Sequence, residues 1–168
     1  NTVTVTTPAI PYFDSPEGYY TITEYELDDD NEIDPTSKYT FPMYIGVDPS
    51  DETSIYIINF GGWYSLGQIA CEAIYDPDEH VIYIPSGTQI GEHPDYGTVV
   101  TGGINASITA YTSYIVINFT PLGGLLEIDG YYRVYCSAGT FGWYTMSGVH
   151  DVETSEVKPF KTVRRYLK

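Results

Sequence analysis

Two pairs of adjacent aromatic residues are the strongest candidates for ligand binding in this sequence. Trp63 and Tyr64 follow a pair of glycines, and Trp143 and Tyr144 follow a single glycine. A Trp or Tyr on a glycine-framed loop offers a flat apolar face with a polar tip, which can stack on a sugar ring or line the mouth of a lipophile cavity. The alternative is that both Trp side chains plug the ends of the fold. We predict a ligand site at these four residues.

The densest acidic run could supply oxygen ligands to a hard cation. Its carboxylates alternate along the chain at Asp28, Asp30, Glu32 and Asp34, and carboxylate oxygens are the groups that Ca²⁺ prefers. Ile33 stands where an EF-hand loop requires glycine, so a solvated loop is the alternative. We therefore expect no cofactor, with calcium as the one candidate.

Four acids fall within expected strands, at Glu24, Glu26, Glu72 and Glu127. A carboxylate pair could hydrolyse a glycosidic bond. Glu24 and Glu26 share one face of their strand. Glu72, which lies between two small apolar residues, is the best candidate for a buried acid, and the alternative is that all four acids point outward. No motif pairs these acids, so a hydrolase is the third hypothesis for function.

The three histidines, His80, His93 and His150, show no metal-binding or catalytic spacing. The sequence also lacks the Gly-x-Ser-x-Gly elbow that presents a nucleophilic serine. We therefore expect solvated turn histidines, no catalytic residues and no enzyme.

The elements that must position these residues are short strands. Apolar and aromatic runs recur between Gly, Pro, Asp and Asn, and no stretch has the helical period. This pattern predicts an all-β fold: an antiparallel up-and-down β-barrel of about eight or more strands, with a β-sandwich as the alternative. The expected strands are 3–7, 19–27, 39–47, 54–60, 68–75, 81–85, 99–110, 114–120, 125–128, 131–137, 141–146 and 162–167.

Two strand pairs repeat one hairpin, in which an Asp-Pro turn at Asp48 or Asp76 separates two strands. In the strand after the first turn, Ile55 and Ile57 share one face, while Tyr56 lies on the other. Either tyrosines cover the outside of the barrel while isoleucines fill it, or the outer face packs against another segment or subunit.

Charge excludes several partners. The chain of 168 residues has 7 Lys and Arg against 23 Asp and Glu, a net charge of −16. Nucleic acid and anionic membranes would be repelled. Five of the seven cations fall in 158–168. This basic tail is expected to be a closing strand on the acidic body or a docking segment for a protein partner. No apolar run is long enough to span a membrane.

Punctuation by proline separates 1–17 from 18–168. We expect the first segment to be a wrapping strand and linker or the remnant of a preceding domain, and the second to be the barrel. Cys71 and Cys136 fit no metal or redox spacing. Buried free thiols and one disulfide are both open.

The pattern resembles lipocalin-like (calycin-like) domains of surface lipoproteins from gut commensal bacteria. The resemblance rests on Gly18-Tyr19-Tyr20 opening the first long strand, and on the segments 73–77 and 81–87. Tyr20 replaces the Trp typical of that family. The resemblance implies a barrel that is extracellular, on the cell surface or in the periplasm of a bacterium, with a lipid anchor upstream as a further expectation.

Together these observations predict a non-enzymatic binding module that takes a small lipophilic ligand or a glycan at the barrel mouth. The alternative is a structural or protein-interaction domain of a larger surface assembly, with a filled barrel.

Overall fold

The computed structural model describes residues 7–63 and 69–151. The strand expected at 162–167, the basic tail and all but the last residue of the strand expected at 3–7 lie outside this part. The strands are β1 Gly18–Glu26, β2 Tyr39–Asp48, β3 Asp51–Ile58, β4 Cys71–Asp76, β5 Val81–Pro85, β6 Thr88–His93, β7 Gly97–Ile104, β8 Tyr111–Thr112, β9 Tyr114–Thr120, β10 Leu125–Asp129, β11 Tyr131–Cys136 and β12 Gly139–His150. Two short 3-10 helices are η1 Pro35–Ser37 and η2 Phe60–Gly62.

Eight strands close into an antiparallel barrel, which confirms the expected fold class. Neighbours run in the order β1, β2, β3, β4, β5, β9, β10 and β12, and β12 pairs back with β1. Closure leaves no free edge in the barrel itself, which removes a template for aggregation.

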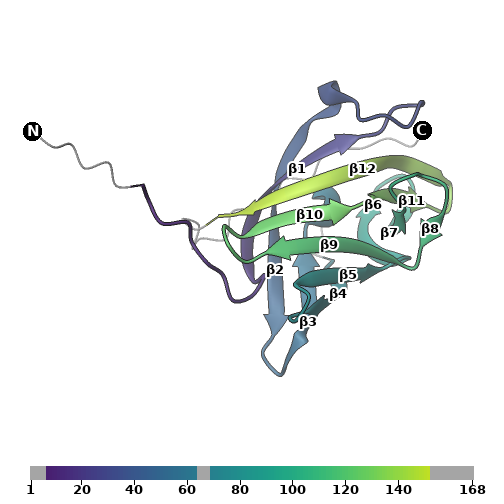
Figure 1. Cartoon of the computed structure of the whole chain (residues 1–168). Helices are drawn as coiled ribbons and strands as arrows, with labels where there is room; N and C mark the ends of the chain where they lie inside the picture. Colours follow the sequence, from purple (N-terminus) through teal and green to yellow (C-terminus); the bar gives the residue numbers. More distant parts are fainter. Residues whose placement is uncertain (1–6, 64–68, 152–168) are drawn as a thin grey trace, which may run out of the picture.

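Four further strands extend the sheet beyond the barrel. β10 and β11 form one long strand interrupted at Gly130, whose φ of 80° favours glycine. β12 pairs with both halves of this long strand, with β10 in the barrel and with β11 in the extension. From β11 the extension continues through β7 to β6, and β8 pairs with β7. Figure 1 shows these extra strands gathered at one end of the barrel.

Strict alternation along the strands fills the barrel with side chains. Ile55 and Ile57 point inward from β3, whereas Tyr56 points outward. The largest fully buried side chains include Tyr20, Tyr132, Phe60, Phe141 and Met43. An eight-stranded barrel has an interior just wide enough for its own side chains to fill, and this one is filled by aromatic and branched residues.

The segment before β1 lies against the end of the barrel opposite the extension. Tyr12 bridges to Leu122 in the turn between β9 and β10, and the Phe13 amide donates to the Pro121 carbonyl at 3.0 Å. The Phe13 ring stacks on His150 at the end of β12, with centroids 4.0 Å apart.

The repeated Asp-Pro turns work as the sequence indicates. Asp48 Oδ1 accepts from the Ser50 amide at 2.8 Å, and Asp76 Oδ1 accepts from the Asp78 amide at 3.0 Å. Each carboxylate thus fixes the hairpin that follows it. Both cysteines are free and buried in this structure, which selects one of the two states that the sequence left open.

Candidate functional site

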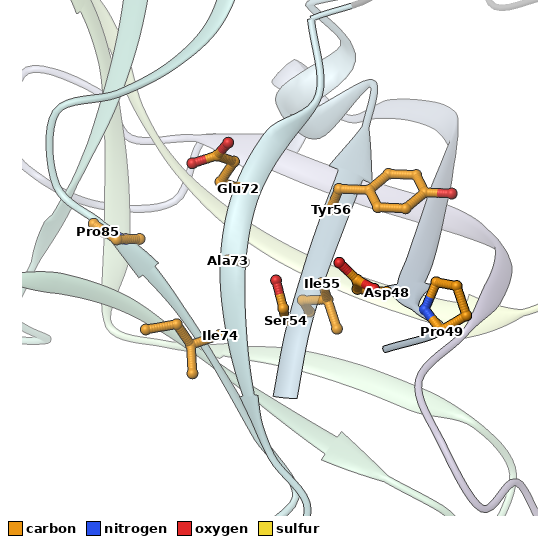
Figure 2. A pocket seen from close by; sticks show the side chains of 9 residues that line it. All are labelled: Asp48, Pro49, Ser54, Ile55, Tyr56, Glu72, Ala73, Ile74 and Pro85. Carbon is orange, nitrogen blue, oxygen red and sulfur yellow. The ribbon is translucent and has the colours of Figure 1, made fainter. Parts of the chain in front are cut away.

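A groove of about 590 Å³ crosses the outer face of β3 and β4. Tyr56 and Asp48 lie toward one side of it, and Ile74 and Pro85 toward the other (Figure 2). Tyr56 is 37% exposed and Ile74 is 49% exposed. The full lining is Asp48, Pro49, Ser54, Ile55, Tyr56, Glu72, Ala73, Ile74 and Pro85.

Tyr56 is held in a fixed position by the strand beside it. Its ring covers Gly46 on β2, where a Cβ atom would overlap the ring. Tyr44 on β2 lies next to it with ring centroids 6.2 Å apart, and Tyr19 on β1 continues the row at 4.8 Å from Tyr44. Three strands thus present a row of tyrosines whose last member borders the groove.

The groove is polar as well as aromatic. A hydrogen bond from the Ser50 side chain and a second from its amide lower the pKa of Asp48, so this carboxylate is charged at neutral pH. Glu72 and Ser54 are exposed. The groove therefore combines an aromatic face with carboxylate and hydroxyl oxygens.

The sequence-predicted aromatic residues do not form one surface. Trp63 is 6% exposed and Tyr144 is 5% exposed, so both differ from the exposed platforms that the glycine-framed loops led us to expect. Tyr64 lies outside the described residues. Trp143 is half-buried and lines a second groove, of about 280 Å³, beside the acidic loop.

Trp63 is buried because aromatic residues of the extension close over it. Its ring meets Phe141 edge-on with centroids 4.7 Å apart, and His93 lies 6.3 Å away. Tyr96 packs on His93 at 4.7 Å. This cluster joins the extension to the barrel. Trp63 is therefore packed as in the alternative that the sequence offered, whereas Trp143 is not.

The buried acid is Glu24 and not Glu72, so the interpretation that all four strand acids point outward holds for Glu72 but is wrong for Glu24. Glu24 is 2% exposed and accepts a hydrogen bond from Tyr132 inside the barrel. Glu24 points inward because it alternates in step with the buried residues Tyr20 and Ile22 on β1. On β4 the residues on either side of Glu72 point inward, so Glu72 points outward. Glu24 and Glu26 share one face of β1, as expected, and that face is the inward one.

Two of the three histidines are not solvated turn residues. His93 is buried and its Nδ1 accepts from the Asp95 amide at 3.1 Å. His150 is wedged between Phe13 and Tyr20. His80 does lie in the turn between β4 and β5, where its Nδ1 is 3.0 Å from the Tyr75 hydroxyl.

The acidic loop uses its carboxylates to fix its own backbone. Asp28 Oδ1 accepts from the amides of Asp30 and Glu32, both at 2.9 Å. Asp34 Oδ1 accepts from Thr36. Within residues 7–63 and 69–151, no group of three or more His, Cys, Asp or Glu side chains is arranged to hold a metal ion.

Comparison of the chain with protein-family models, with curated proteins and with solved structures found no match. In the same described ranges, no helix has the length and apolar character needed to cross a bilayer.

The groove could not be predicted from the sequence. Alternation places Tyr56 on the face opposite Ile55 and Ile57, but it does not reveal that Gly46 lets the ring lie flat or that Asp48 lines the same groove. Gly46 pairs with Tyr56 across β2 and β3, so the hairpin that the Asp-Pro turn indicates was the available signal.

Proposed function

We propose that this chain is a non-enzymatic binding module that holds a glycan in the groove on β3 and β4. One observation carries the proposal: an exposed tyrosine, fixed in place by Gly46 and Tyr44, borders a groove that also contains carboxylates. Sugar rings have an apolar face that stacks on aromatic rings and hydroxyl groups that donate to carboxylates.

The charge of the chain supports an uncharged glycan in this groove. Asp48 and Glu72 both line it, and the whole chain has a net charge of −16. A polyanion would be repelled from this surface. Neutral hydroxyl groups donate hydrogen bonds to the same carboxylates without this repulsion.

A site on the outside replaces the barrel mouth in this proposal because the barrel ends are occupied. Trp63 and Phe141 pack together at one end, and Phe13 and His150 stack at the other. A ligand at either end would have to displace these contacts, whereas the groove is open. The resemblance to lipocalin-like domains of bacterial surface lipoproteins supports an exported location for such a module.

The test is thermal unfolding of the chain with soluble polysaccharides, compared with Tyr56→Ala. A glycan at one hundred times its Kd stabilises the fold by about 2.7 kcal/mol. Loss of the stacked ring should weaken binding about tenfold, because aromatic contacts contribute about 0.5–1.5 kcal/mol beyond buried area. Tyr12→Ala, which removes an exposed tyrosine that does not line the groove, is the matched control.

Equal binding by both variants would contradict the groove as the site. Release of reducing ends from a bound glycan, abolished in Glu72→Gln, would contradict the non-enzymatic part and favour a hydrolase.

A second candidate function is an interaction domain of a larger assembly. An apolar patch favours it, in which exposed residues of the N-terminal segment meet those of β9, β10 and β12. The patch consists of Ile10, Tyr12, Leu122, Leu125 and Val149. Thermal unfolding unchanged by every glycan, together with a mass that rises with concentration, would favour this candidate over the first.

A further inference from the structure

Arg133 lies between two tyrosine rings on the outer face of the extension. Its guanidinium carbon is 3.9 Å from the ring centroid of Tyr135, two residues along β11, and 3.9 Å from that of Tyr111 on β8. Trp143, one of the aromatic residues that the sequence singled out, is its cross-strand neighbour on β12. Gly102 is its neighbour on β7 and has no side chain to cover it.

This arginine has no acidic partner in the part of the chain that the structure describes. Arg133 and Lys38 are the two Lys or Arg residues among 7–63 and 69–151, which are rich in Asp and Glu. No carboxylate of those ranges forms an ion pair with Arg133, and its buried Nε has no hydrogen-bond partner there. Among residues 7–63 and 69–151, the acidic protein thus holds this cation between aromatic rings without an acid to neutralise it.

The packing leaves one edge of the guanidinium for a ligand. Both rings lie against the guanidinium carbon, and Nε is buried. The terminal nitrogens are not among the buried unpartnered atoms, and no described residue accepts from them. The edge formed by these two nitrogens matches the two oxygens of a carboxylate, and flanking rings exclude water and strengthen the ion pair.

We propose that Arg133, Tyr111 and Tyr135 form a binding site for a carboxylate group on a ligand with no other charge. A single negative charge suits this surface better than a phosphate, because a phosphate carries up to two charges and the chain has a net charge of −16. The site is separate from the groove on β3 and β4 and does not depend on a glycan binding there.

The experiment follows the Nε–H signal of Arg133 by ¹⁵N NMR during titration at fixed ionic strength. An acidic sugar and a peptide C-terminus both supply the carboxylate, so one arm compares glucuronate with glucose and the other compares N-acetylglycine with N-acetylglycinamide. We expect saturable binding of at least one acid, with a Kd on the order of 1 mM, and none of its uncharged counterpart. The acid that binds more tightly identifies the source.

Variants separate this site from general electrostatics. Arg133→Met should abolish binding, and Arg133→Lys should weaken it at least tenfold because an ammonium lacks the planar edge. Lys38→Met removes one exposed charge elsewhere and should leave the Kd unchanged. Tyr111→Ala removes one wall at a residue that is 61% exposed, so the fold should persist while affinity falls severalfold.

Three results would overturn the proposal: no saturable shift with either acid, equal losses in Arg133→Met and Lys38→Met, or glucose 6-phosphate binding as tightly as glucuronate. Arg133→Met and Arg133→Lys lack the Nε–H group. Their titrations are therefore followed by the backbone amide shifts of β7 and β11.

Discussion

Removal of one hydroxyl group inside the barrel should measurably destabilise the protein. Tyr132 donates a hydrogen bond to Glu24, and both side chains are at most 2% exposed. Tyr132→Phe keeps the ring contacts with Phe60 and Tyr144, at 5.0 and 5.4 Å, and deletes only the donor. Removing one partner so that a buried acceptor loses its hydrogen bond costs about 1–3 kcal/mol. We therefore expect the free energy of unfolding to fall by about 2 kcal/mol.

The assay is urea unfolding of wild type, Tyr132→Phe, Glu24→Gln and the double variant. At this chain length, 1 kcal/mol corresponds to about 2–4 °C, so thermal unfolding should show a decrease of about 4–8 °C. The double-mutant cycle should give a coupling energy of about 1 kcal/mol or more between the two side chains. Tyr114→Phe, at an outward tyrosine that is 44% exposed, is the control and should stay within about 0.5 kcal/mol.

A cost for Tyr132→Phe no larger than that for Tyr114→Phe would refute this reasoning. It would mean that the hydroxyl is not what satisfies the Glu24 carboxylate. A coupling energy near zero would also refute it, because the two side chains would then contribute independently.

Two further predictions concern the packing of the barrel. Burial raises the pKa of the Cys71 thiol far above 9.0, so above that pH the folded state keeps this proton while the unfolded state loses it. The free energy of unfolding should therefore decline by about 1.4 kcal/mol per pH unit above about pH 9. Urea unfolding of Cys71→Ala should lack this part of the decline. Gly124 has a φ of 61°, and a Cβ there would lie 2.5 Å from His150 Cβ. Gly124→Ala should therefore lower the free energy of unfolding by about 3 kcal/mol or more, as measured by thermal unfolding. Gly87 also has a positive φ but has open space around it, so Gly87→Ala should lower the free energy of unfolding by about 1 kcal/mol.

The strands that the sequence predicts best are those with clean alternation or strong β-branched content. The bounds predicted for β5 and β9, 81–85 and 114–120, are those observed. β7 ends at Ile104 instead of 110 because the Asn105 side chain accepts from the amides of Thr109 and Ala110 and closes a turn. In the sequence, the only sign of this competition between side-chain and backbone hydrogen bonds is the single residue Asn105.

Strands that depend on distant neighbours were missed or shortened. β6 contains Gly91 and several polar residues, and it forms because β7 returns beside it. β12 runs on through Ser147 and Gly148, which favour strands poorly, because β1 and β10 pair with it from both sides. Local propensity cannot supply such pairings.

The candidate sites show the same division. Tyr131-Tyr132-Arg133-Val134-Tyr135 alternates, so the sequence could place Arg133 and Tyr135 on one face. The second ring could not be predicted, because Tyr111 reaches Arg133 only through the pairing of β8 with β7 and of β7 with β11. The composition revealed that cations are scarce in the body, but not that one is left without an acid in the described part.

The filled interior explains why both proposed sites lie on outer faces, one on the barrel and one on the extension. An eight-stranded barrel needs small inward residues to leave a ligand cavity, and this one places Tyr20, Tyr132 and Phe141 inside. Alternation then gives the opposite faces of the same strands to Tyr56 on β3 and Arg133 on β11. The same side-chain alternation that fills the interior therefore presents a tyrosine to one candidate ligand and an arginine between aromatic rings to the other. Enlarging the interior should not create affinity for either ligand, because neither site uses an inward residue.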